Sequence, residues 1–118
     1  MRTGFGRHIS SLMEQVQGAR GAALLDLDGI PIESQLAGTD IVSLAAECTP
    51  FLRDAQRAAQ ELGLGETQAI HLLGEEANLL FRFLRSEWLL ALVAENQGNW
   101  GKARHRLERE ARRLEPQL

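Results

Sequence analysis

The sequence offers little that would indicate covalent cross-links, secretion or a membrane span. Its single cysteine, Cys48, excludes an internal disulfide framework. The longest apolar run, residues 88–94, is far shorter than the ~20 residues that cross a bilayer. Residues 1–8 lack the apolar stretch of a signal peptide. We therefore expect a cytoplasmic protein.

Catalytic and metal-binding motifs are also missing. His8, His71 and His105 lie on separate predicted elements, without the His-Glu-x-x-His or Cys-x-x-Cys spacing of a metal site. The phosphate-binding pattern Gly-x-x-x-x-Gly-Lys-Ser/Thr is absent, and no base is placed beside Cys48. We therefore expect no catalytic residue, no metal and no cofactor, and we interpret the chain as a binding protein rather than an enzyme.

Length and composition describe one ordinary globular domain. The 118 residues suffice for a single core, so we treat residues 1–118 as one domain. Hydrophobic residues make up 44% and charged residues 25% of the chain, which are common values. The net charge of −3 argues against nucleic acid as a partner, and we do not expect contact with a membrane.

The chain is organised around residues 20–35. Two short apolar runs are joined there by Asp28-Gly29, a pair that tolerates the positive φ of a tight hairpin turn. Pro31 cannot donate to a ladder, so the second strand is predicted at a sheet edge. Acidic residues in this segment resemble part of a calcium loop, but strands flank it and apolar residues interrupt it. We favour the turn.

Three segments have apolar residues at the helical period. They cover residues 8–17, the stretch from an N-cap at Asp40 to about Leu62, and the stretch from residues 97–101 to just before Pro116. In the second helix the stripe predicted to be buried is Ile41, Leu44, Ala45, Cys48, Leu52, Ala55, Ala59 and Leu62. In the last helix it is Trp100, Ala103, Leu107, Ala111 and Leu114. Pro50 lies inside the second helix, and we favour a kink over a break because the stripe keeps its phase.

Residues 66–73, 78–84 and 88–93 predict three antiparallel strands. The last of them is apolar on both faces, which is typical of a central strand covered on both sides. The predicted fold class is α/β, a single five-stranded antiparallel sheet with helices on both faces. The element order is helix, strand, strand, helix, strand, strand, strand, helix.

Several strings in this order resemble the Roadblock family of dynein-light-chain-like domains. They are GAALLDLDGIPI at residues 21–32, ELGLG at 61–65, LLALV at 89–93 and NQGNWGKAR at 96–104. The resemblance covers about residues 9–114, and Pro50 departs from the family's pattern. It implies a dimer in which the long helices pair and the sheets join through the strand after that helix. It also implies a Ras-like small GTPase as partner, which the dimer regulates or scaffolds without supplying an arginine finger.

The resemblance and the helical projection together give two sets of candidate residues. The partner-binding face of the long helix lies opposite the stripe predicted to be buried and comprises Val42, Ala46, Thr49, Arg53, Gln56 and Arg57. The homodimer interface comprises Ala45, Leu52, Glu66, Thr67, Gln68, Ala69, Ile70 and His71. The strand at residues 66–73 contains no proline or lysine that would protect its edge from pairing with another strand.

Two other functions and one surface stay open. The chain could be a structural adaptor dimer without nucleotide dependence, or a small-ligand sensor. The sensor is disfavoured because Leu and Phe fill the predicted core and few polar groups converge. The last helix carries a basic stripe, formed by Lys102, Arg104, Arg106, Arg109, Arg112 and Arg113. We favour a solvated face over a docking surface, with Glu108 and Glu110 forming helix-spaced pairs with the arginines.

Overall fold

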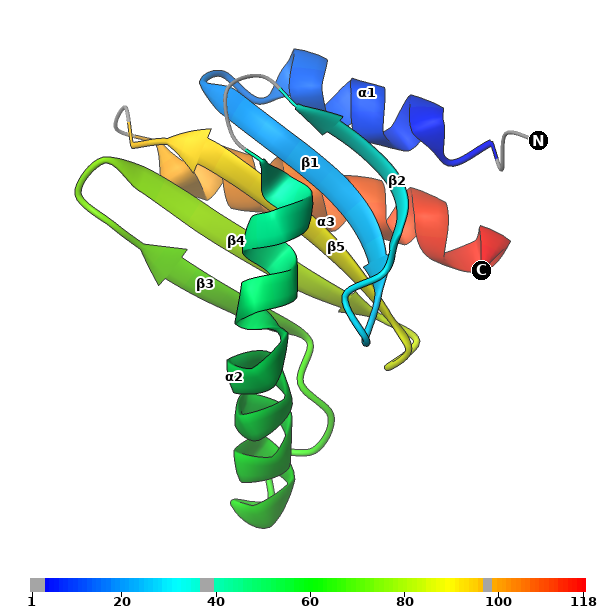
Figure 1. The fold of residues 1–118 in the computed structure, drawn as a ribbon, viewed down its shortest axis with the longest axis vertical. Coiled ribbons are helices and arrows are strands. Elements are labelled where there is room, and N and C mark those ends of the chain that lie inside the picture. The colour runs from blue at the N-terminus through cyan, green and yellow to red at the C-terminus, as the bar shows by residue number, and fades with distance from the viewer. Residues whose placement is uncertain (1–3, 37–39, 97–98) are drawn as a thin grey trace.

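In a computed structural model of the protein, residues 4–36, 40–96 and 99–118 are described, and they form three α-helices and a five-stranded sheet (Figure 1). The helices are α1 (Gly6–Gln15), α2 (Ile41–Glu61) and α3 (Trp100–Leu114), which is followed by a 3-10 turn at Glu115–Gln117. The strands are β1 (Ala19–Asp26), β2 (Pro31–Leu36), β3 (Ala69–Leu73), β4 (Ala77–Leu84) and β5 (Trp88–Glu95). No helix in these three ranges is long and apolar enough to cross a membrane.

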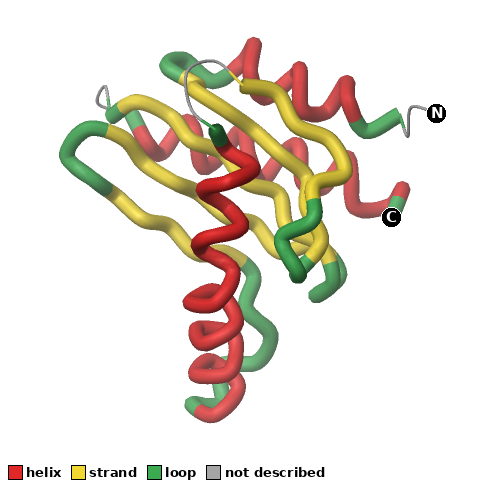
Figure 2. Tube along the Cα trace, in the orientation of Figure 1, coloured by secondary structure: helices red, strands yellow, loops and turns green. Residues whose placement is uncertain are grey.

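The sheet is antiparallel, with the strand order β2-β1-β5-β4-β3. The β1–β2 hairpin turns at Asp28-Gly29, and β2, which begins at Pro31, is an edge strand as predicted. The other edge is β3. Figures 1 and 2 show α2 on one face of the sheet and α1 and α3 on the other. The predicted fold class and element order are therefore confirmed.

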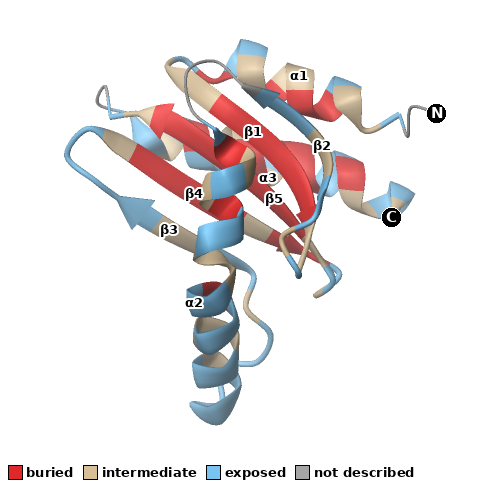
Figure 3. Ribbon diagram, in the orientation of Figure 1, coloured by how far each residue is buried: buried red, intermediate tan, exposed pale blue. Residues whose placement is uncertain are grey.

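Each face of the sheet has its own core because the side chains of β4 and β5 alternate between the faces. On the α2 face, Phe81 of β4 and Ala23 of β1 both pair with Ala91 of β5. These residues belong to a buried cluster with Ile41, Ala45 and Leu52 of α2. The two alanines leave room for the helix to lie close to the sheet. The opposite face packs leucines of the central strands against α1 and α3, and Figure 3 shows the central strands buried along most of their length.

The long helix α2 begins at the predicted cap. An Asp40 carboxylate oxygen accepts from the backbone N–H of Ser43 at 3.2 Å, and the Ser43 hydroxyl donates to the other at 2.8 Å. These bonds, the hydroxyl's first, lower the pKa of Asp40. The helix continues through Pro50, so it does not break and restart there. It ends at Glu61, and Gly63 follows with a φ of +74°, a conformation that glycine adopts without strain.

Three sequence predictions outside α2 need correction. The strand β3 begins at Ala69 rather than residue 66, although the Gln68 carbonyl still accepts from the Phe83 N–H of β4 at 2.9 Å. Trp100 is 39% exposed because the first turn of α3 lies near the sheet edge, where its ring contacts His71. Glu110 is buried in contact with His8 of α1 instead of pairing with arginines on the surface.

Candidate protein-interaction surface

The second half of α2 extends beyond the sheet into solvent. Figures 1 and 2 show the helix crossing the sheet with its first half and projecting past it with its second. Leu52 is the last α2 side chain that is buried, and every residue of the helix after it is exposed or half-buried (Figure 3). The α2 helix therefore carries surface that its own chain does not cover.

An apolar row follows this helix along one side. We define the α2 seam as Leu44, Cys48, Phe51, Ala55, Ala58 and Leu62. These residues alternate spacings of four and three, the pattern by which one helix presents a continuous apolar strip to another. Leu44 and Cys48 partly pack on the core, whereas Phe51 is 38% exposed and Leu62 is 74% exposed. The seam becomes more exposed toward the projecting end of the helix.

The strand β3, which follows α2 in the chain, forms the other edge of the sheet. It pairs with β4 alone, so its outer edge is unpaired among the described residues. Ile70 packs toward α2, and Leu72, which points to the same face, is 44% exposed. An apolar helix surface and an unpaired strand edge therefore lie on neighbouring elements.

The predicted dimer residues divide into three groups. Ala45 and Leu52 are buried in the protomer's own core, so they present no surface to a second copy, and the exposed apolar residues are their neighbours in the α2 seam. Ala69, Ile70 and His71 lie in the edge strand. Glu66, Thr67 and Gln68 lie in the return segment before it, where the Ser86 hydroxyl donates to the Glu66 carboxylate.

The predicted partner-binding face is partly covered by the β1–β2 hairpin. Gly29, at the hairpin tip, has a φ of +85° and lies so close to α2 that a Cβ would come within 3.3 Å of the Ala46 Cα and 3.2 Å of the Thr49 Oγ1. Arg53 donates to the Leu27 carbonyl at 3.0 Å and forms an ion pair with Asp28. Ala46, Thr49 and Arg53 therefore hold the hairpin.

The remaining residues of that face have different environments. Val42 is half-buried against the core. Gln56 and Arg57 line a shallow hollow with Gln60 and the return segment. Arg57 is paired with Asp54 at 2.6 Å, and its side chain is 69% exposed. Arg57 is thus the more exposed arginine of the predicted set, since the Arg53 side chain is 54% exposed and bonded to the hairpin.

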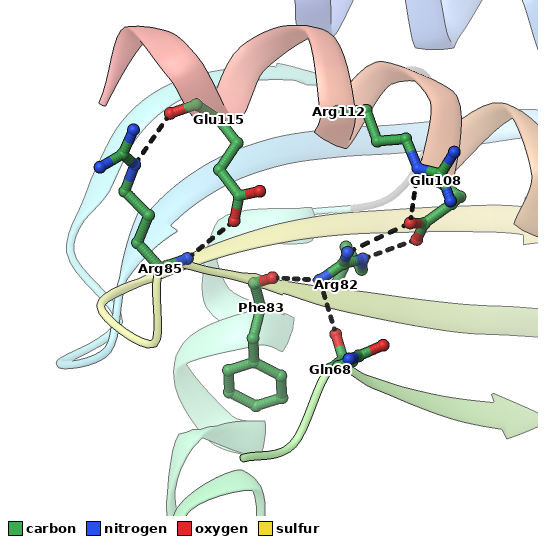
Figure 4. A network of polar contacts seen from close by, with 7 residues as sticks. All are labelled: Gln68, Arg82, Phe83, Arg85, Glu108, Arg112 and Glu115. Atoms are coloured by element: carbon green, nitrogen blue, oxygen red, sulfur yellow. Dashed lines mark hydrogen bonds and ion pairs between the residues drawn. The ribbon is translucent and has the colours of Figure 1, made fainter.

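A polar network ties β4 to the opposite helix layer (Figure 4). Arg82 donates to Glu108 of α3 and to the Phe83 carbonyl, and Glu108 also accepts from Arg112. Just after the end of α3, the Glu115 side chain accepts from the Arg85 backbone N–H at 3.0 Å. Three members of the basic stripe therefore contact other groups of the chain. They are Arg112 in this network, Arg104 above the Trp100 ring at 5.4 Å, and Arg106, which donates to the Gln15 side chain at 3.4 Å.

Charge is distributed unevenly between α3 and the rest of the chain. The helix carries six basic and two acidic residues, so it contributes +4 and all other residues contribute −7 to the net charge of −3. Of the two acidic residues, Glu110 is buried and Glu108 is paired with arginines. The exposed side of α3 is therefore cationic.

The environments of Cys48 and His71 do not resemble those of reactive groups. Burial, and next the neighbouring Glu47, raise the pKa of the Cys48 thiol and so disfavour its reactive thiolate. Burial, and next Arg104, lower the pKa of His71, which favours its neutral form. Among residues 4–36, 40–96 and 99–118, no group of three or more acidic, histidine or cysteine side chains is placed to hold a metal ion.

The sequence pattern identified α2 and β3 but missed two seam residues, Phe51 and Ala58. The sequence predicts one buried stripe, whereas the structure buries Ile41, Ala45 and Leu52 of it and leaves Leu62 74% exposed, so this part of the prediction is wrong. The spacing of four and three was the signal in the sequence that marks this second row.

Comparisons with known proteins agree with this architecture. The structure superposes on the gliding protein MglB from Thermus thermophilus with a TM-score of 0.83 at 22% identity, covering 94% of this chain and 85% of that one. Against MglC from Myxococcus xanthus the TM-score is 0.67 at 25% identity, with coverage of 97% and 98%. An uncharacterised Methanocaldococcus jannaschii protein, MJ1340, is 26% identical over 103 residues, which are 86% of this chain and 90% of that protein.

The family model of the Roadblock/LC7 domain matches residues 7–94. This match begins in α1 and ends within β5, so it includes the hairpin, the long helix and the β3 edge. The chain belongs to the Roadblock/LC7 domain family.

Proposed function

We propose that this protein is a homodimeric, non-enzymatic regulator or scaffold of a Ras-like small GTPase. The observation that carries the proposal is the uncovered α2 seam together with the unpaired β3 edge, in a chain of the Roadblock/LC7 family. A GTPase partner is what the resemblance to the Roadblock family implies. The fold similarity to the gliding protein MglB is consistent with such a role.

The energetics of α2 support association with a second copy. A helix segment shorter than ~12–15 residues is only marginally stable in water without tertiary packing. The part of α2 beyond Leu52 makes little tertiary contact within its own chain. The seam residues Phe51 and Leu62, which flank this part of the helix, expose 38% and 74% of their surface. Packing them against the same row of a second copy removes apolar area from water and stabilises the helix, at about 25 cal/mol per Å² buried.

The strand edge supports the same arrangement. The outer N–H and C=O groups of β3 can form a ladder with an identical strand of a second copy, because antiparallel pairing of identical edges is compatible with two-fold symmetry. An interface that uses both the seam and the edge would place the two α2 helices next to each other on one side of a continuous sheet.

In such a dimer the paired α2 helices would offer the GTPase a platform that includes Gln56 and Arg57. The platform would act by position. It would bind one conformation of the partner's switch loops better than the other, and it would thereby shift their equilibrium by the difference in affinity. Arg57 would provide charge complementarity, whereas Arg53 would act indirectly by holding the hairpin against α2.

The test is a binding measurement with the Ras-like GTPase encoded nearest to this gene, loaded with a non-hydrolysable GTP analogue or with GDP. We expect tighter binding of one nucleotide form and loss of that binding on Arg57→Glu. The control is Arg109→Glu, the same charge change on α3, which should bind normally. Equal affinity for both nucleotide forms would identify an adaptor instead, and no binding to either form would refute the GTPase proposal.

A further inference from the structure

The α3 helix exposes a row of cations, which we call the basic row. It consists of Lys102, Arg106, Arg109 and Arg113, spaced by four, three and four residues, so it follows one side of the helix for about 16 Å. Lys102, Arg109 and Arg113 are exposed, and none of them is in an ion pair with residues 4–36, 40–96 or 99–118. Both acidic residues of α3 are bound to other elements, so they do not neutralise the row.

The α2 helix carries a row of the opposite charge, which we call the acidic row. It consists of Glu47, Asp54 and Glu61, which are exposed and lie seven residues apart, a repeat of about 10 Å along the helix. Asp54 shares its charge with Arg57 at 2.6 Å, whereas Glu47 and Glu61 have no ion pair in the part of the chain that the structure describes. The acidic row therefore retains negative charge at both ends.

The acidic row lies on the outward side of α2. Glu47 and Asp54 each follow a buried residue, Ala45 and Leu52, by two positions. Two positions correspond to about 200° around a helix, so the carboxylates are on the side opposite to the one that packs on the sheet. No other element of the same chain covers that side in Figures 1 and 2. The row is accessible to another molecule.

The two rows match in repeat as well as in charge. Lys102 and Arg109 are seven residues apart, and so are Arg106 and Arg113. Both helices therefore repeat their charge about every 10 Å. Two helices that pack side by side with equal repeats can form ion pairs at successive steps, as the charged flanking positions of coiled coils do.

This pairing cannot form within one chain. The two helices lie on opposite faces of the sheet (Figures 1 and 2), so the sheet separates the basic row from the acidic row. Each copy of the chain thus has a cationic surface on one face and an anionic surface on the other. The complement of each surface is present on every other copy.

We propose that the basic row of α3 binds the acidic row of α2 in a second copy of this chain. The contact joins two different surfaces, so it adds copies in an open series and does not close at two. Exposed ion pairs are individually weak and are screened by salt, so the series forms at low ionic strength and high protein concentration. The basic stripe of α3 is then a docking surface, where the sequence favoured a solvated face.

The contact has a consequence for the GTPase platform, and this consequence rests on the proposed function. A copy docked on the acidic row covers the outward side of α2, beside the platform residues Gln56 and Arg57. Docked copies and the GTPase therefore compete for α2. In the homodimer each particle has two rows of each sign, and the two contacts strengthen each other by multivalency.

The first experiment is sedimentation velocity of the full chain over a range of protein concentrations, at about 20 mM and about 300 mM salt. The weight-average mass at low salt should rise with concentration to at least about twice its value at high salt. The mass at high salt reports the homodimer, so a monomer there overturns the dimer without affecting the salt-dependent increase. A mass that does not respond to salt would show that the rows do not bind each other.

Charge reversals locate the contact. Glu47→Lys and Arg109→Glu change exposed side chains, and each should weaken the low-salt association about tenfold. Each variant keeps one row intact, so an equimolar mixture should associate again, but only as far as single contacts between unlike particles. The control is Glu75→Lys, the same charge change in the β3–β4 turn, which should associate like the wild type. A mixture that fails to associate, or an equal loss in the control, would overturn the proposal.

Discussion

Arg82 on β4 and Glu108 on α3 form a bidentate ion pair, with Nε–Oε2 at 2.6 Å and Nη2–Oε1 at 3.1 Å. Their side chains are 15% and 35% exposed. The pair is therefore less solvated than an ordinary surface bridge. It joins the sheet to the helix layer, and its two residues are 26 positions apart in the sequence.

Because of this pair, the stability of the folded protein should decrease at acidic pH. The hydrogen bond from Arg82 is the main cause that lowers the pKa of Glu108, and burial opposes it. A carboxyl with a lower pKa in the folded state stabilises the protein above its unfolded pKa of ~4.3, and this stabilisation is lost as pH falls through the folded value. Glu108→Gln should cost about 1 kcal/mol at neutral pH, between the values for exposed and buried charged pairs.

The measurement is urea unfolding of both proteins at a fixed protein concentration across the acidic range. The difference in unfolding free energy should shrink below about pH 4.3 and vanish below the folded pKa. Glu75→Gln, the same change at an exposed position in the β3–β4 turn, is the control and should have almost no effect. A Glu108 effect that does not vary with pH would contradict this assignment.

Replacing one member of the buried pair between α1 and α3 should destabilise the protein more than replacing both. His8 Nδ1 lies 2.6 Å from Glu110 Oε2, and the residues are 7% and 4% exposed. His8→Leu leaves the carboxylate buried without its partner and should cost about 3–5 kcal/mol, whereas His8→Leu with Glu110→Met should cost much less. Chemical denaturation of the four proteins in this cycle gives the coupling energy, and additive effects would refute the pairing.

The close approach of the hairpin to α2 can be measured with two glycines of the same conformation. Gly29 and Gly65 both have a φ of +85°, but only Gly29 has neighbours within 4 Å of an added Cβ. Gly65→Ala should cost about 1 kcal/mol for the backbone conformation alone. Gly29→Ala should add about 1–3 kcal/mol for the contact with α2. Equal losses in thermal or urea unfolding would show that the hairpin moves away easily.

The α2 seam predicts a specific way to separate the dimer. Phe51→Glu places a charge in the middle of the apolar row and should yield monomers of about 13 kDa in sedimentation experiments at micromolar concentration, where the unaltered protein should be a dimer. Ile30→Glu makes the same kind of change at the exposed hairpin tip, where the side chain is 59% exposed, and should leave the dimer intact. A wild type that sediments as a monomer would refute the seam as an interface.

The sequence was sufficient for the fold because local patterns and strand alternation agree over most of the chain. The Asp28-Gly29 turn, the edge position of Pro31, the Asp40 cap and the two-faced β5 strand all follow from local chemistry. The structure has each of these features.

The surface was harder to predict because periodicity shows which residues align on a helix but not how much of that helix meets the sheet. The seam residue Phe51 and the exposed Trp100 both depend on where a helix passes the sheet edge. The His8–Glu110 contact joins positions 102 residues apart, which no local pattern reveals.

The unequal charges of α3 and the remaining chain have a practical consequence at the bench. A protein with a pI near 5.6 is normally captured on an anion-exchange column at neutral pH. Here the cationic helix should let the molecule adhere to a cation-exchange or heparin resin as well, oriented by one side, and elute from it at modest salt as screening weakens the attraction.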